Sequence, residues 1–285
     1  MTVFYHSHGK MLSEGEVLHI RREEIIMKNL ILEKAANGEP SFGTFTQLKS
    51  SVVIDMLACT EFDYFVIDME HAPLGTDEAD ELIAPTAARG KSPVVRVNAI
   101  ERSAVLKALD SGAHALIIPN LKSMDEARRL VEWSKFAPLG ERGYCPTRDG
   151  AWGAGPQFED GMKGYMAYAN ENTLIIPQCE TKECVEIVEE VAALEGIDGL
   201  FVGPMDLSIN LGVPGDFDAP VFKEAVARTV KACKDNGKMC MGFAGNTDLA
   251  RTYINNGFSS IAYGLDVSMM FSAYTAAIKE LKEIR

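Results

Sequence analysis

The chain has 285 residues and 47% of them are hydrophobic, which is enough for one large domain or two small ones with a substantial core. No apolar run approaches the roughly 20 residues needed to cross a bilayer, and the polar start from Met1 to Arg22 shows no signal peptide. The net charge of -13 argues against nucleic acid and anionic membranes as partners, although a small anionic substrate needs only local positive charge.

The six cysteines show neither CxxC pairs nor the spacing of a zinc site. Most of them sit in apolar runs, so we expect buried free thiols. Free thiols are typical of a reducing compartment, and the sequence therefore predicts a cytoplasmic protein.

Short apolar runs alternate with segments of helical periodicity along most of the chain. Residues 1–27 are different, and we expect a partly ordered, helical N-terminal extension there. A helix from Ile25 to Ala36, which Asn37-Gly38 stops, is suited to covering the bottom of a barrel. The predicted strands are Phe42–Phe45, Tyr64–Asp68, Pro93–Val97, Ala115–Ile118, Leu174–Gln178, Gly199–Val202, Met239–Gly242 and Ser260–Tyr263. The predicted helices are Ser50–Cys59, Asp77–Ala88, Arg102–Leu109, Asp125–Ser134, Thr181–Leu194, Pro220–Asn236, Asn246–Asn256 and Asp266–Leu281.

This alternation predicts that residues 28–285 form a single α/β domain, a (β/α)8 TIM barrel. A doubly wound open sheet is the competing architecture. The count of strands and the absence of GxGxxG after the first strand weigh against it. In a barrel, the reactive side chains lie at the carboxyl ends of the strands.

One segment, Pro138–Gly164, does not fit the alternation, because it is a long glycine-rich stretch that carries Trp152. A loop of this length is usually a lid or a binding loop, or disordered. We expect it to contribute to the substrate site or to a subunit interface. Its Arg142 and Arg148 are candidates for binding a distal carboxylate of the substrate, with solvated side chains as the alternative.

Two carboxylates, Glu180 and Asp206, follow neighbouring predicted strands. Both are expected just beyond the carboxyl ends of these strands, because the segment from Leu174 to Ser208 has the pattern of a βαβ unit. Two hard oxygen ligands in this position can hold Mg²⁺ or Mn²⁺ with open positions for substrate. Taken alone, an acidic residue after a strand is more often a helix cap.

Further polar residues fall at the same end of other predicted strands. Asp68, Glu70 and His71 follow the second strand, Arg96 the third and Gln178 the fifth. Taken alone, His71 is more often a hydrogen-bonded structural histidine, and Arg96 can simply bridge acidic residues. Their convergence with the two carboxylates favours a catalytic site.

These residues lie in motifs whose order and spacing resemble those of the HpcH/HpaI aldolases, class II pyruvate aldolases that act on 4-hydroxy-2-oxoheptanedioate and 2-keto-3-deoxy sugar acids. The resemblance covers roughly Lys28 to the C-terminus. Cys179 stands where an aliphatic residue is usual, and Met205 where Ala or Asn is common. The motifs are Phe65-Val66-Ile67-Asp68-Met69-Glu70-His71-Ala72-Pro73, Val94-Val95-Arg96-Val97, Gly140-Glu141-Arg142-Gly143, Gln178-Cys179-Glu180-Thr181 and Phe201-Val202-Gly203-Pro204-Met205-Asp206-Leu207-Ser208.

The resemblance implies a divalent metal ion, Mg²⁺, Mn²⁺ or Co²⁺, and a homohexamer built as a trimer of dimers. Its substrates would be a 2-oxo acid and an aldehyde, related by reversible aldol cleavage through a metal-stabilised pyruvate enolate. Glu180 and Asp206 would be the metal ligands.

The remaining residues can be given roles from their chemistry. His71 is suited to be the general base for the 4-hydroxyl proton, with Asp68 or Glu70 orienting it. Arg96 offers a cationic fork for developing oxyanion charge. We expect Gln178 to hydrogen-bond a substrate oxygen and backbone amides near residues 203–206 to bind the substrate carboxylate. The expected substrate-binding residues are Gln178, Gly203, Pro204, Met205 and Glu70.

Three alternatives stay open from the sequence. Another metal-enolate enzyme, such as an oxaloacetate decarboxylase or a macrophomate-synthase-like catalyst, would use the same residues. A Schiff-base aldolase would use Lys122, after the fourth strand. A non-catalytic binding protein on a barrel scaffold would bind its ligand without turnover.

Overall fold

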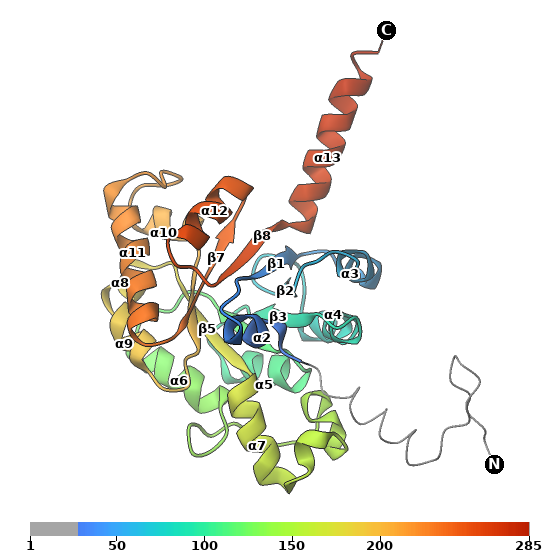
Figure 1. The fold of residues 1–285 in the computed structure, drawn as a ribbon, viewed down its shortest axis with the longest axis vertical. Helices are drawn as coiled ribbons and strands as arrows, with labels where there is room; N and C mark the ends of the chain where they lie inside the picture. The colour runs from blue at the N-terminus through green and yellow to red at the C-terminus, as the bar shows by residue number, and fades with distance from the viewer. Residues whose placement is uncertain (1–27, 285) are drawn as a thin grey trace, which may run out of the picture.

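The eight predicted strands all form in the computed structural model, which describes residues 28–284. They are parallel and close into one barrel in the order β1 to β8, with β8 paired to β1. The fold is therefore a (β/α)8 TIM barrel, as predicted (Figure 1). The expected extension at residues 1–27 lies outside the described part of the chain. The strands are β1 (Ser41–Thr46), β2 (Tyr64–Asp68), β3 (Ser92–Arg96), β4 (Ala115–Ile118), β5 (Leu174–Cys179), β6 (Gly199–Val202), β7 (Met239–Ala244) and β8 (Ser260–Leu265).

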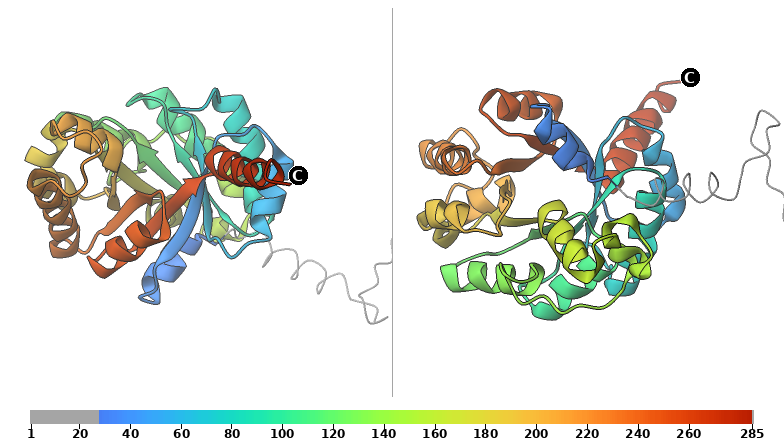
Figure 2. Two further views of the ribbon diagram at one scale, coloured as in Figure 1. Left: turned by 90° about the horizontal axis from the view of Figure 1, so that it is seen from above. Right: turned by 60° about the horizontal axis from the view of Figure 1, so that its bottom comes forward.

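Helices follow the strands and surround the barrel (Figure 2). They are α2 (Leu30–Ala36), α3 (Ser51–Ala58), α4 (Thr76–Ala88), α5 (Arg102–Asp110), α6 (Met124–Ser134), α7 (Gly161–Asn172), α8 (Lys182–Glu186), α9 (Val188–Ala193), α10 (Pro204–Asn210), α11 (Pro220–Asp235), α12 (Thr247–Asn255) and α13 (Asp266–Leu281), with short 3-10 helices at Arg148–Gly153 and Pro156–Phe158. The helix predicted over Thr181–Leu194 breaks at Ile187 into α8 and α9. The sequence analysis missed α10, although Pro204 at its first position is a common helix start.

The strands alternate between two hydrophobic layers, because successive side chains of a strand point to opposite faces. In β2, Tyr64 and Val66 lie in the core inside the barrel, whereas Phe65 and Ile67 pack under the outer helices. Ile31 of α2 joins the inner core, so this helix covers the bottom of the barrel as expected. The same alternation places the last inward side chain of several strands at the barrel mouth.

The last helix, α13, is the exception to the packing of helices against the barrel. It points away from the barrel and carries the C-terminus at its far end (Figure 1). Within the described chain its apolar side chains are exposed, including Phe271 at 73% and Tyr274 at 71%. An apolar hollow of about 360 Å³, lined by Phe42, Ile254 and Tyr263 among others, lies on the barrel beside α12.

Candidate active site

Asp68, Arg96 and Gln178 occupy inward positions at the carboxyl ends of β2, β3 and β5. Each lies two residues beyond an inner-core residue of its own strand, such as Val66 before Asp68. Register pairs Asp68 directly with Arg96 on the neighbouring strand. The fold therefore brings side chains from separate sequence segments to one end of the barrel.

Asp68 and Arg96 form a buried, two-pronged ion pair. The Arg96 Nε donates to Asp68 Oδ1 at 2.9 Å, and Nη2 donates to Oδ2 at 2.8 Å. Asp68 is fully buried and Arg96 is 7% exposed. Burial opposes ionisation of Asp68, but the hydrogen bonds and charge of Arg96 outweigh it and lower the pKa of Asp68. The arginine is consequently held as a rigid fork at the barrel mouth.

His71 and Glu70 lie on the turn that follows β2. Asp68 Oδ1 accepts the backbone N–H groups of Glu70 at 3.1 Å and His71 at 3.3 Å, which fixes this turn. Glu70 Oε2 lies 3.1 Å from Arg96 Nη1 and 3.8 Å from His71 Nε2. The His71 side chain is 56% exposed. Glu70 is thus the carboxylate beside the imidazole, whereas Asp68 holds the backbone below it.

Glu180 is a buried carboxylate without a cationic partner among residues 28–284. Its Oε1 accepts the backbone N–H of Asn120 at 2.8 Å, and its Oε2 is in close contact with Gln178 Nε2. Burial, reinforced by the negative charges of Glu70 and Asp206, raises the pKa of Glu180 to about 7. A cation at this position would relieve that repulsion.

Gly203 leaves room at the heads of Gln178 and Glu180. A Cβ at this position would lie 2.6 Å from Gln178 Nε2 and 2.8 Å from Glu180 Oε2. Gln178 Oε1 is buried and has no hydrogen-bond partner within the described chain. An oxygen acceptor and a carboxylate therefore face a space that a side chain at residue 203 would fill.

Asp206 lies in the first turn of α10, directly after Gly203-Pro204-Met205. Asn210 Nδ2 donates to the backbone oxygens of Glu180, at 3.1 Å, and Asp206, at 3.0 Å, and so ties α10 to the end of β5. A cavity of about 200 Å³ opens at this end of the barrel. Its lining includes the predicted residues His71, Arg96, Gln178, Gly203, Pro204, Met205 and Asp206, while Asp68, Glu70 and Glu180 lie outside the lining.

The donor set suits a hard divalent ion, because carboxylate and amide oxygens are the ligands that Mg²⁺ and Mn²⁺ prefer. Within residues 28–284, no group of three or more His, Cys, Asp or Glu side chains is arranged to hold a metal ion. A site here would therefore have Glu180 and Asp206 as its carboxylates, with Gln178 beside them and other positions left to water and substrate.

The structure adds two residues that the sequence analysis missed. Gln47, after β1, donates from Nε2 to Asp68 Oδ2 at 2.8 Å. Its own backbone N–H, at 3.0 Å, and that of Leu48, at 3.1 Å, donate to the buried carboxylate of Asp266 at the start of α13. Gln47 is a polar residue just beyond a predicted strand, so the rule that found Asp68 would also have found it.

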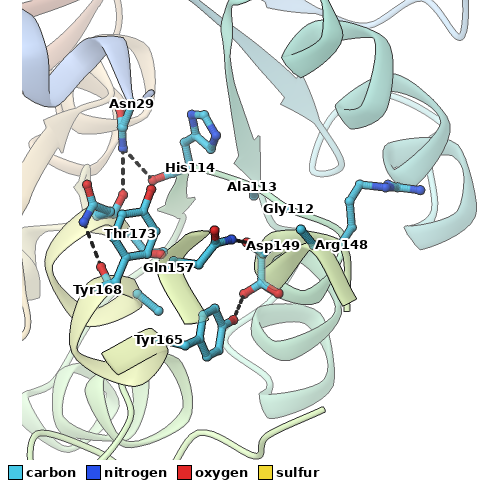
Figure 3. A pocket seen from close by; sticks show the side chains of 13 residues that line it. Asn29, Gly112, Ala113, His114, Arg148, Asp149, Gln157, Tyr165, Tyr168 and Thr173 are labelled. Carbon is cyan, nitrogen blue, oxygen red and sulfur yellow. Dashed lines mark hydrogen bonds between the residues drawn. The ribbon is translucent and has the colours of Figure 1, made fainter. Parts of the chain in front are cut away.

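The loop at Pro138–Gly164 lies at the opposite end of the barrel. Arg142 pairs with Asp110 at 2.9 Å and Asp149 at 2.7 Å, and Arg148 pairs with Asp80. Asp149 borders a polar cavity of about 50 Å³ beneath β4 and β5 (Figure 3). Both hypotheses for these arginines, distal-carboxylate binding and a solvated state, are therefore wrong, and the loop does not border its own chain's mouth cavity.

The fold and the mouth residues define a barrel enzyme with a charged site at the carboxyl ends of its strands. The sequence matches the HpcH/HpaI aldolase/citrate lyase family over residues 41–273. The chain belongs to this family, and it is an enzyme of the lyase class.

Relatives of known activity include two aldolases of Escherichia coli. A 2-keto-3-deoxy-L-rhamnonate aldolase is 29% identical over 249 residues, covering 87% of this chain and 90% of the relative. A 4-hydroxy-2-oxo-heptane-1,7-dioate aldolase is 29% identical over 252 residues, covering 88% and 94%. The solved structure of an HpcH/HpaI aldolase/citrate lyase family protein from Burkholderia cenocepacia J2315 superposes with a TM-score of 0.81 at 34% identity, covering 90% of this chain and 100% of that one.

No helix between residues 28 and 284 combines the length and apolar character needed to cross a membrane.

Proposed function

We propose that this chain is a divalent-metal-dependent pyruvate aldolase, which reversibly cleaves a 4-hydroxy-2-oxo acid to pyruvate and an aldehyde. The observation that carries the proposal is the meeting, at one cavity, of Gln178 and Asp206 with Arg96 and His71, with the buried Glu180 adjoining. The relatives named above act, by their names, on 2-oxo acids, which supports the same substrate class here.

Glu180 and Asp206 would hold the metal ion, for which Mg²⁺, Mn²⁺ and Co²⁺ are the candidates. The mutual repulsion of these carboxylates and the orphaned Gln178 Oε1 support a cation at this place. When bound, the ion would supply Lewis acidity toward the keto oxygen of the substrate.

Arg96 stabilises the negative charge that develops on the keto oxygen when the C3–C4 bond breaks. Its guanidinium is fixed by Asp68, so it does not have to reorganise during the reaction. Gln178 lies beside this position and orients the substrate through a hydrogen bond. The backbone N–H groups from Gly203 to Asp206 are suited to binding the substrate carboxylate.

His71 takes the proton of the 4-hydroxyl group in the cleavage direction, directly or through a water. Its exposed position at the mouth allows this proton to reach solvent. Glu70, 3.8 Å from Nε2, orients the imidazole, and Asp68 fixes the turn that carries both residues.

The test is a pyruvate-release assay over a panel of 4-hydroxy-2-oxo acids, with and without added metal after exhaustive chelation. Metal-dependent pyruvate release together with an aldehyde product is the expected result. Decarboxylation of oxaloacetate without aldehyde formation on any substrate would instead identify a decarboxylase or a macrophomate-synthase-like catalyst.

The Schiff-base alternative receives no support from the site. Lys122 is exposed and does not line the cavity at the barrel mouth. Borohydride trapping with pyruvate is therefore expected to leave the chain unmodified.

We also propose that the enzyme is a cytoplasmic homo-oligomer, with a homohexamer as the expected state. The exposed apolar side chains of α13 and the apolar hollow beside α12 support association between copies. All six cysteines are free, which is compatible with a reducing cytoplasm.

A further inference from the structure

The cavity at the barrel mouth has two chemically different sides. His71, Arg96, Gln178 and Asp206 form its polar side. The opposite side is apolar, and its rim residues come from three consecutive parts of the barrel: Met205 after β6, Phe243 in β7 and Leu265 at the end of β8. A substrate that binds across the cavity therefore meets charge at one end and hydrocarbon at the other.

Packed aromatic rings form the floor of the apolar side. The Phe45 ring lies edge-on to Phe201, with centroids 6.1 Å apart, and to Phe243 at 5.9 Å. The Arg96 guanidinium carbon lies 4.7 Å from the centre of the Phe45 ring. These contacts hold the rings in place, so this side presents carbon surface and few hydrogen-bonding groups.

The cavity offers no free cation to a second acidic group on the substrate. Arg96 is the one Lys or Arg that lines it within residues 28–284, and its Nε, Nη2 and Nη1 atoms already face Asp68 and Glu70. The two arginines considered from the sequence, Arg142 and Arg148, are paired at the other end of the barrel. A carboxylate placed on the apolar side would lose its water without gaining a partner, which is strongly unfavourable.

We propose that the aldehyde partner of this enzyme is uncharged and apolar, with its carbon chain against Met205, Phe243 and Leu265. This inference rests on the proposed function, because it assigns the second substrate of the same reaction. In the synthetic direction a methyl proton of pyruvate leaves to a base, C3 bonds to the aldehyde carbon and the aldehyde oxygen gains a proton. The product is a 4-hydroxy-2-oxo acid with an apolar tail, and no further reactant is consumed.

The test compares two aldehydes of matched shape in aldol addition to pyruvate. In 4-methylpentanal an isopropyl group replaces the carboxylate of 4-oxobutanoate, and the rest of the chain is the same. We expect kcat/KM to be at least roughly a hundredfold higher for 4-methylpentanal, because the acid would be buried unpaired. Equal values, or a preference for 4-oxobutanoate, would overturn the inference.

A pair of variants tests the assigned position. Met205 is 52% exposed, so replacing it should disturb the fold little. Met205→Arg is expected to raise kcat/KM for 4-oxobutanoate about tenfold above the uncharged control Met205→Gln, since it supplies a partner for the acid. The same preference in both variants would show that the aldehyde tail does not lie along this wall.

Exchange of pyruvate methyl protons with solvent separates this inference from the proposed function, because exchange needs the enolate step and no aldehyde. Normal metal-dependent exchange combined with a preference for the charged aldehyde would overturn the inference alone. Absence of exchange in the wild-type enzyme would overturn the proposed function, and the inference would fall with it.

Discussion

The two ends of the barrel treat buried charge in different ways. At the amino end, Lys135 is 1% exposed and its Nζ donates to the Asn170 oxygen, the Thr173 oxygen and Asp198. Arg142 at this end has its own carboxylate partners. At the carboxyl end, Arg96 contacts Asp68 and Glu70, and the nearby Glu180 and Asp206 have no cation within the described residues.

The difference separates structure from function in one fold. Paired charges at the amino end stabilise the loop packing and leave little charge to compensate. The surplus of negative charge at the mouth costs stability unless a cation binds there, and such sites are typical of function. Variants at the mouth are therefore expected to change catalysis, and variants at the amino end to change stability.

The strongest test of this contrast removes the carboxylates that lack a partner. Glu180→Ala and Asp206→Ala are each expected to abolish divalent metal binding and aldol cleavage while the fold stays intact, since each removes a proposed ligand. Titration calorimetry with Mn²⁺ and circular dichroism measure the two effects. Glu195→Gln, at an exposed acid, is the control. Full activity of either alanine variant after chelation would contradict the metal assignment.

Removing the base should have the next largest effect. His71→Ala is expected to lower kcat for cleavage by roughly two to four orders of magnitude, the usual contribution of a positioned acid–base group. Metal affinity should change much less, because His71 is not a proposed ligand. A kcat within a few-fold of wild type would place the base elsewhere.

The fork geometry of Arg96 can be tested without removing its charge. Lysine keeps the charge but cannot make both bonds to Asp68, so Arg96→Lys should lower kcat about a hundredfold or more. Exchange of pyruvate methyl protons should slow as well, because it passes through the same enolate. Normal exchange with slow cleavage would mean that Arg96 positions the aldehyde instead.

A smaller effect is expected from Gln47, which holds Asp68 from outside the cavity. Gln47→Leu should lower kcat by roughly tenfold, because it removes one hydrogen bond to a buried charged group. Gln157→Leu is a matched control at the amino end, where Gln157 donates to the Asp149 backbone. Equal kcat losses in both variants would remove the distinction between the two ends.

The smallest effect on activity is expected from His114, beneath the barrel. Burial lowers its pKa from 6.5 to about 4. Between these values the unfolded chain binds a proton that the folded protein does not, so stability falls as the pH drops through this window. His114→Asn should remove roughly 3 kcal/mol of this pH dependence and leave kcat unchanged. Urea unfolding at pH 4.5 and 7 measures it; an unchanged difference between the two pH values would contradict the assignment.

The sequence predicted the barrel well because each strand carries its own signal. The period-two pattern that placed Gln178 and Glu180 on one face and Cys179 on the other agrees with the structure, where Cys179 Sγ lies 3.5 Å from Thr229 of α11. The site residues were found by the same local rule, since each follows a short apolar run. Their roles stay predictions.

The features that the sequence did not predict depend on partners far along the chain. Nothing near Arg148 in the sequence indicates that Asp80 will pair with it. A long charged side chain also carries no periodic pattern that fixes its direction. The exposure of α13 could not be foreseen either, because its apolar periodicity is the same whether it packs on its own barrel or elsewhere.

The anchoring of α13 gives protein concentration a role in this enzyme. The helix begins at Asp266, directly after Leu265 of the cavity wall, and Asp266 holds the loop that carries Gln47. If copies associate through α13, dilution strips the cover from the helix whose first residue supports the site. Mass action then couples folding stability to the amount of protein present, and activity per chain falls as the solution is diluted.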